Sequence, residues 1–251
     1  YFYLYDNSGS NVNAGGYWGG AGSCCEESMS RKIIEGPNDS FYIIGYTEAY
    51  NGTVSNNYGG SDGWIMNIIP VTTDGVLSYE INWEKTYGGP NDDVFTDALL
   101  YDSELFIVGG QRTSSGLVQG CWFLRTNMDG DIISESTLSP NSNQKITLDI
   151  SMNSDDNFLL FTTFCEVNSE GMPIACYGNV LEVDQDGSLI ENNIWEIDEE
   201  YPGWVSQSYD DNKFDVFFEN GNYHMTRSEW LIVEEGPNNY DYQYIKFDND
   251  F

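Results

Sequence analysis

Short runs of apolar and aromatic residues, each closed by a turn rich in Asp, Asn and Gly, recur along the chain. The clearest set lies between Gly59 and Gly110, where four such runs follow one another. Runs of about four to eight residues that are rich in Val, Ile and aromatics and bounded by turn residues predict β-strands. Apolar residues at helical spacing are hard to find. The chain is therefore expected to be all-β.

Two features of these runs recur at a nearly fixed interval. One is the turn after the first strand of each unit, which ends in glycines 66, 55 and 57 residues apart, at Gly9, Gly75, Gly130 and Gly187. The other is the last strand of each unit, whose starts are 64, 53 and 56 residues apart, at Phe41, Leu105, Phe158 and Phe214. Both features indicate a repeat of about 58 residues. A unit of this kind cannot bury its own apolar face, so its copies must stack.

Four strand-like runs for each repeat, with Gly-rich turns, predict a β-propeller-like array of four-stranded blades. The expected array is a single domain over residues 1–251, with units at 1–60, 61–118, 119–175 and 176–240 and a terminal strand at 241–251 that repeats the first. Residues Gly221 to Glu235 add a strand that fits no other unit. This segment indicates an extra hairpin, or a split or partial fifth blade.

The acidic composition limits the partners of the chain. It has 41 Asp and Glu against 9 Lys and Arg, a formal net charge of −32. This charge would repel nucleic acid and anionic lipid, and no apolar run approaches the roughly 18 residues of a membrane span. We therefore expect no nucleic-acid partner and no membrane insertion. Because His224 is the single histidine and no other catalytic constellation stands out, no catalytic residue is predicted.

Five cysteines suggest disulfides: Cys24, Cys25, Cys121, Cys165 and Cys176. Cys165 and Cys176 flank a hairpin-like segment, which a disulfide would restrain. Cys121 could pair with Cys24 or Cys25, or these two neighbours could pair with each other. Neither CxxC nor Cys/His spacing of a zinc site is present.

Three segments resemble a known repeat family. They are FYIIGYTEA from Phe41, GGSDGW from Gly59 and INWEKTYGGPNDD from Ile81. This region, residues 41–115, is similar to the repeat of secreted bacterial and archaeal β-propellers, whose pattern runs GGSD-W, then W-KTYGG---D. The resemblance implies a propeller in an exported, often surface-attached protein. It therefore implies an extracellular or cell-surface location, and it brings no catalytic residues with it.

The turns supply candidate metal ligands. A hard cation such as Ca²⁺ binds closely spaced carboxylate and carbonyl oxygens, and the candidate ligands are Asn127, Asp129, Asp131, Asp184 and Asp186. Asp92, Asp93 and Asp97 form a further acidic cluster. The alternative is that Asp and Asn in such turns bond to nearby backbone amides. No cofactor is required by the sequence, and calcium is the candidate.

Aromatic side chains supply candidate sugar-binding residues, because Trp and Tyr rings stack on the apolar face of a sugar. The candidates are Tyr17, Trp18, Tyr201, Trp204 and Trp230. Trp64 and Trp122 lie at equivalent positions of the repeat and are expected in the core.

These features predict a non-catalytic extracellular or cell-surface module that binds a protein partner or a surface glycan, within a larger extracellular or outer-membrane assembly. One alternative is a carbohydrate-active enzyme of the glycoside hydrolase or lyase type. Another is a purely architectural subunit of a surface assembly.

Overall fold

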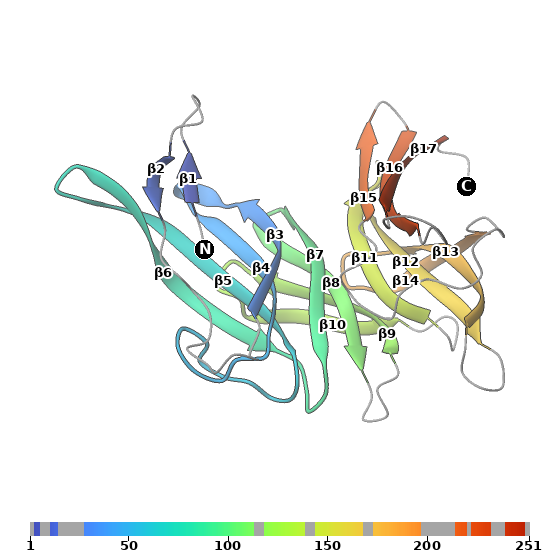
Figure 1. Ribbon diagram of the computed structural model, residues 1–251, viewed down its shortest axis with the longest axis horizontal. Coiled ribbons are helices and arrows are strands. Elements are labelled where there is room, and N and C mark those ends of the chain that lie inside the picture. Colours follow the sequence, from blue (N-terminus) through green and yellow to red (C-terminus); the bar gives the residue numbers. More distant parts are fainter. Residues whose placement is uncertain are drawn as a thin grey trace. The chain divides into compact units, whose positions relative to one another are not determined.

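A computed structural model describes backbone and side chains over residues 28–112, 120–138, 149–162 and 179–192. It describes strand backbone alone over 3–5, 11–14, 118–119, 144–148, 163–167, 173–178, 193–196, 214–219, 222–231 and 239–248. The described elements are β-strands and one 3₁₀ turn, η1 (Pro37–Asp39) (Figure 1). No helix in this described part is long and apolar enough to cross a membrane.

Three of the sheets have four strands, which lie in each sheet in the order of the chain. The first contains β3 (Ser28–Glu35), β4 (Phe41–Thr47), β5 (Asp62–Thr73) and β6 (Val76–Tyr87). The second contains β7 (Asp93–Tyr101), β8 (Glu104–Arg112), β9 (Val118–Asn127) and β10 (Ile132–Leu138). The third contains β11 (Gln144–Met152), β12 (Phe158–Val167), β13 (Pro173–Val183) and β14 (Leu189–Glu196). The expected all-β architecture with four-stranded units is therefore confirmed.

Two smaller sheets complete the described strands. One is three-stranded and contains β15 (Phe214–Glu219), β16 (Asn222–Leu231) and β17 (Asn239–Asp248). The other pairs β1 (Tyr3–Tyr5) with β2 (Asn11–Ala14). The chain forms two compact units, residues 1–106, 111–117 and 126–132 in the first and residues 107–110, 118–125 and 133–251 in the second.

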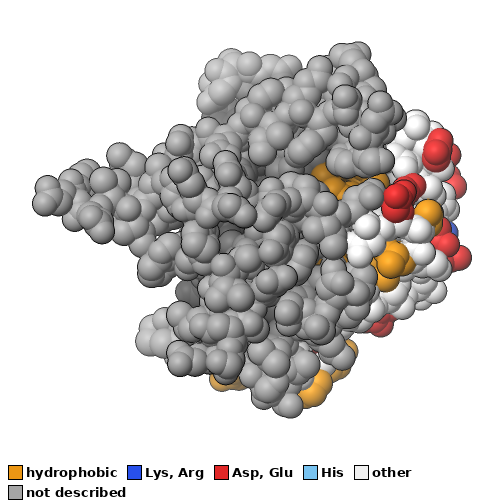
Figure 2. Space-filling view, turned by 90° about the vertical axis from the view of Figure 1, so that its right-hand side faces the viewer, with side chains coloured by type: hydrophobic (Ala, Val, Ile, Leu, Met, Phe, Trp, Pro, Cys, Tyr) orange, Lys and Arg blue, Asp and Glu red, His pale blue; other side chains and the backbone are white. Residues whose placement is uncertain are grey.

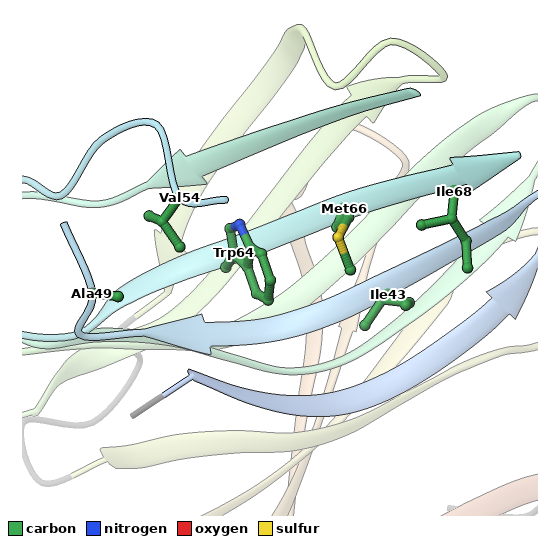
Figure 3. Close-up of a cluster of buried hydrophobic side chains, with 6 residues drawn as sticks. All are labelled: Ile43, Ala49, Val54, Trp64, Met66 and Ile68. Atoms are coloured by element: carbon green, nitrogen blue, oxygen red, sulfur yellow. The ribbon is translucent and has the colours of Figure 1, made fainter. Parts of the chain in front are cut away.

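The middle strands of the first sheet are buried on both faces. Strand β5 is buried from Asp62 to Ile68, although successive side chains point to opposite faces. On one face Trp64, Met66 and Ile68 pack with Ile43 of β4 (Figure 3). The loop between β4 and β5 adds two further side chains to this cluster, Ala49 and Val54. Burial on both faces explains why these strands appear in the sequence as continuous apolar runs.

The expectation that Trp64 and Trp122 lie in the core is confirmed, because their side chains are 3% and 1% exposed. Each indole N–H is nevertheless hydrogen-bonded. Nε1 of Trp64 donates to Glu84 Oε2 at 2.8 Å, and Nε1 of Trp122 donates to Glu135 Oε1 at 2.8 Å. The repeat therefore places an apolar ring in the core and satisfies its polar atom on the next strand.

The turn glycines of the second and third sheets lie against the preceding sheet. The carbonyl of Gly130 accepts a hydrogen bond from the Tyr87 hydroxyl at 2.7 Å, and a side-chain carbon on Gly130 would lie 2.8 Å from the Trp83 ring. Gly187 is placed likewise, with its carbonyl accepting from the Ser136 hydroxyl at 3.3 Å. Both glycines have left-handed backbone, with φ of 74° and 78°. These turns therefore need glycine for conformation and for space.

We expect Gly130→Ala to destabilise the protein far more than Gly75→Ala. Gly75 has φ of 80° in the corresponding turn of the first sheet, but no atom lies within 4 Å of a side-chain carbon built on it. Gly75→Ala should therefore cause only left-handed strain, about 1 kcal/mol. Gly130→Ala adds the clash with Trp83 and Tyr87 and should lower the free energy of unfolding by about 2 to 4 kcal/mol. Denaturant unfolding of both variants measures this difference, and equal losses would contradict the close approach of the turn.

Candidate functional site

Two aspartates, each at the start of a strand, lie next to one another in the first unit. Asp62 begins β5 and Asp93 begins β7. The backbone joins the two segments, because the Asp93 N–H donates to the Ser61 carbonyl at 2.6 Å and the Gly60 N–H donates to the Asn91 carbonyl at 3.3 Å. The chain thereby brings together two residues 31 positions apart.

The carboxylate of Asp62 is buried and only partly satisfied. Asp62 is 0% exposed and Asp93 is 3% exposed. Oδ2 of Asp62 accepts from the Tyr58 N–H at 2.5 Å, whereas Oδ1 has no hydrogen-bond partner among the described residues. Oδ2 of Asp93 accepts from the Gly89 N–H at 2.6 Å. A buried carboxylate oxygen without a partner strongly disfavours the charged form of Asp62.

Burial raises the pKa of Asp62 to about 6, and the nearby charge of Asp93 also raises it. The backbone hydrogen bonds from Tyr58 and Gly59 act in the opposite direction and lower the pKa. Desolvation is the largest of these effects, so the net shift of the Asp62 pKa is upward. Near neutral pH the pair therefore contains one carboxyl group that readily takes up a proton, beside a second buried acid.

Gly88 borders both carboxylates. Oδ1 of Asp62 and Oδ2 of Asp93 each lie 2.6 Å from the position that a side-chain carbon on Gly88 would occupy. The two oxygens are therefore no more than twice 2.6 Å, or 5.2 Å, apart. Gly88 is exposed and has φ of 145°. A side-chain carbon at Gly88 would therefore clash with both carboxylates, which places the two acids directly behind this exposed backbone position.

The loop that leads to Asp62 contains exposed aromatic and polar residues. Tyr50 and Tyr58, in the loop between β4 and β5, are 69% and 53% exposed. Ser61 of the same loop donates its hydroxyl to Glu48 at 3.4 Å and its N–H to Asp92 Oδ1 at 3.2 Å. The arrangement therefore combines a buried acid pair with exposed aromatic rings and surface carboxylates.

The candidate calcium ligands at the turns serve mainly to hold the backbone. Oδ1 of Asn127 accepts the N–H groups of Asp129 and Asp131 at 3.0 and 2.8 Å. Oδ1 of Asp184 accepts the N–H groups of Asp186 and Ser188 at 3.0 and 2.8 Å. These contacts match the alternative to calcium binding, in which Asp and Asn side chains of a turn accept hydrogen bonds from nearby backbone amides.

Two of the exposed acids of these turns, Asp131 and Asp186, each bind a cationic side chain. Lys85 Nζ lies 2.6 Å from Asp131 Oδ1, and Arg125 Nη1 lies 2.8 Å from Asp186 Oδ1. Asp97 likewise pairs with Lys32 at 2.8 Å. Across the part of the chain that the structure describes, no three His, Cys, Asp or Glu side chains are grouped closely enough to hold a metal ion. Calcium binding at these turns stays a prediction.

Several sequence candidates lie outside the described residues: Tyr17, Trp18, Tyr201, Trp204, Cys24 and Cys25. Only the backbone is described for Trp230, in β16, and for Cys165 and Cys176. Those two cysteines are directly opposite one another across β12 and β13, and their disulfide stays a prediction. Of the alternatives for Cys121, pairing with Cys24 or Cys25 is not what the structure has, because Cys121 is a buried thiol whose Sγ lies 3.4 Å from the Thr162 hydroxyl.

Sequence reasoning missed the pairing of Asp62 with Asp93. A signal was present, because GGSD and YGGPNDD are the two best-preserved motifs of the repeat and each ends in one of these aspartates. Spacing along the chain does not show that the ends of the two motifs meet. The pairing of the β5 and β7 starts is a tertiary contact.

The chain was compared with known families, curated proteins and solved structures. No protein-family model matches the chain, and no curated protein matches it. Among solved structures, it is similar to MPT-4, a mannose phosphorylase from Leishmania mexicana, in complex with phosphate ion, with 8% identity and a TM-score of 0.39. The likeness covers 86% of this chain and 61% of that enzyme.

The expectation of a non-catalytic binding module is not supported by this comparison, because the similar structure is described as a mannose phosphorylase, which is an enzyme. At this TM-score the likeness assigns no residue, substrate or reaction to the chain. Any assignment has to come from the residues of the chain.

Protonation of Asp62 should make stability depend on pH. Its pKa of about 6 in the folded protein exceeds the ordinary value of 3.8, so the folded state binds this proton more tightly. The resulting stability is fully present below pH 4 and is lost as pH rises through 6, by about 1.4 kcal/mol for each unit of pKa difference. Thermal unfolding of wild type and Asp62→Asn between pH 4.5 and 7.5 should give midpoints that converge at low pH, with the variant more stable at pH 7. A constant difference would contradict the raised pKa.

Proposed function

We propose that this chain is a carbohydrate-active enzyme that cleaves glycosidic bonds, with Asp62 as the general acid and Asp93 as the nucleophile. The observation that carries the proposal is the pair of buried carboxyl groups beside exposed Gly88. Glycoside hydrolysis requires two such groups with different protonation states. The loops that contain Gly88 and Tyr58 border the proposed site.

The two acids are suited to different roles. Asp62, whose pKa burial raises to about 6, holds a proton that it can give to the leaving oxygen of a glycosidic bond. Asp93 accepts the Gly89 N–H at 2.6 Å, and such a hydrogen bond favours the charged carboxylate. An acid with a raised pKa that can donate a proton, beside a carboxylate that accepts a backbone hydrogen bond, is the division of roles that glycosidases use.

The separation of the acids favours retention of configuration at the anomeric carbon. Their facing oxygens are at most 5.2 Å apart. Retaining glycosidases place their carboxyl groups about 5 to 5.5 Å apart, whereas inverting enzymes need about 6.5 to 9.5 Å for a water molecule. Asp93 therefore attacks the anomeric carbon as the C–O bond breaks, and the leaving oxygen takes the proton of Asp62. Water then releases the sugar from Asp93, giving its proton back to Asp62.

Exposed tyrosines provide a surface for the sugar ring. Tyr50 and Tyr58 project from the loop between β4 and β5, and aromatic rings stack on the apolar face of a pyranose. Tyr58 is also tied to the acid pair, because its backbone N–H donates to Asp62. A sugar stacked on this loop would lie near the approach at Gly88.

The proposal also includes the architecture, location and partner of the protein. The four-stranded sheets would be propeller blades, the protein would act outside the cell or at its surface, and its partner would be a glycan. The repeat pattern and the high negative charge support this setting, as does the dispersed placing of acidic side chains on the described surface (Figure 2). Two aspartates need no metal ion or organic cofactor for this reaction.

Asp62→Asn should lower turnover of natural oligosaccharides by about 10²-fold to 10⁴-fold, since it removes proton donation. Turnover of dinitrophenyl glycosides should be largely retained by Asp62→Asn and lost in Asp93→Asn, because this leaving group departs without a proton. The measurement is reducing-sugar release on a panel of gluco-, manno-, xylo- and galacto-oligosaccharides, together with dinitrophenol absorbance. Asp74→Asn, at an exposed turn, is the control and should match wild type. No cleavage of any member by wild type, or full activity of Asp62→Asn, would refute the proposal.

Cleavage should release the sugar with its anomeric configuration retained, because the carboxylates are too close to admit water between the sugar and Asp93. Proton NMR of the first product formed, before mutarotation, distinguishes the two anomers. The same spectrum after equilibration provides the reference. An inverted first product would show that Asp62 and Asp93 are not the catalytic pair.

A further inference from the structure

The first and second sheets share a hydrogen-bonded pair formed by a buried Trp and a less buried Glu. In the first sheet Trp64 of β5 lies opposite Thr86 of β6, and its indole N–H donates to Glu84, two residues before Thr86. In the second sheet Trp122 of β9 donates to Glu135 of β10 in the same way. The indole fills the core and the carboxylate satisfies its one polar atom.

The third sheet has two asparagines at the equivalent positions. Asn179 of β13 precedes the turn glycine Gly187 by eight residues, as Trp122 precedes Gly130. Asn179 lies opposite Ile194 of β14. Two residues before Ile194 is Asn192, which therefore has the position that Glu84 has relative to Trp64. A Trp and Glu pair has thus been replaced by two amides.

These amides have hydrogen-bonding atoms that the described chain leaves unused. Asn179 is 0% exposed, and within the described residues neither its Oδ1 nor its Nδ2 has a hydrogen-bond partner. The same holds there for the buried Oδ1 of Asn192. Buried polar atoms of native proteins are nearly always hydrogen-bonded, because an unmet group loses its hydration without compensation. One donor group and two acceptors are therefore left without a partner among the described residues, at positions where the other sheets have a Trp hydrogen-bonded to a Glu.

We propose that Asn179 and Asn192 form a binding site for a neutral, hydroxyl-bearing ligand, a sugar ring. A hydroxyl group both donates and accepts, so one hydroxyl can pair with Oδ1 and Nδ2 of a single amide. The two amides carry no charge, in contrast to the Glu of the other sheets, and a neutral ligand matches them. A ring is the natural occupant, because the other sheets place the indole of Trp there.

The amide pair lies near the edge of its sheet. Strand β14 is the last strand in the order β11-β12-β13-β14, and Asn192 on it is half-buried. Asn179 lies one strand further in. The assignment of sugar as the ligand class rests on the proposed function, whereas the amide pair belongs to the second unit and Asp62 and Asp93 belong to the first.

The decisive variant restores the pair of the other sheets, Asn179→Trp with Asn192→Glu. Binding is measured by saturation-transfer NMR and thermal shift, using free glucose, mannose, galactose and xylose as probes. We expect wild type to bind at least one of these sugars and the double variant to bind it at least tenfold more weakly, with an equal or higher unfolding midpoint. Asn157→Ala is the matched control, because Asn157 lies in the same unit and its Nδ2 donates to Glu182 at 2.8 Å. This control should bind like wild type.

Other outcomes overturn the inference. If wild type binds none of the sugars and the double variant only raises the midpoint, the amides are a packing defect of the repeat. If the double variant does not fold, Asn179→Ala is the replacement, and wild-type affinity in that variant overturns the site. Oligosaccharide cleavage by the Asp62 pair is measured separately on the same variants. Turnover without binding at Asn179 refutes only this site, and loss of turnover in Asp62→Asn with binding intact leaves it standing.

Discussion

The close approach of glycine turns to the preceding sheet is the constraint on which the repeat depends. Gly130 and Gly187 bring backbone against Tyr87 and Ser136, and neither position has room for a side chain. Salt bridges lie beside both turns, between Lys85 and Asp131 in one and between Arg125 and Asp186 in the other. These exposed ion pairs contribute little by themselves. The contact between the turn backbone and the preceding sheet therefore sets the spacing between neighbouring sheets. The ion pairs lie around this contact.

Burial separates the acids of the proposed catalytic pair from the many acids on the surface. Most described acidic side chains are exposed or cap a turn, as Asp184 does, which suits a chain with net charge −32. Asp62 differs because packing removes it from water while Asp93 lies near it. In such surroundings a carboxyl group takes up protons near neutral pH, as a surface aspartate does not. Reactivity here comes from the environment of a residue that is abundant in the chain.

One candidate site lies in the best-preserved copy of the repeat, and the other lies where a copy departs from the repeat pattern. The acid pair lies within the two motifs that define the repeat, where GGSD meets YGGPNDD. The amide pair lies where the third sheet lacks the Trp and Glu of the others. In both places the informative feature is a buried polar atom without a partner in the described chain. Stacked repeats make such atoms recognisable, because a neighbouring copy shows how the position is otherwise satisfied.

Local patterns in the sequence determined the strands, the glycine turns and the period, because these depend on residues near one another in the chain. The same patterns marked Trp64 and Trp122 as core. Tertiary structure alone decided where the sheets begin, since the first sheet runs from β3 to β6 and crosses the expected border between units at residues 60 and 61. It also decided that Cys121 is a buried thiol and that Asp62 meets Asp93. Strand partners and burial arise from contacts between distant residues, and with 41 acidic residues in the chain, spacing alone cannot identify the two that share a site.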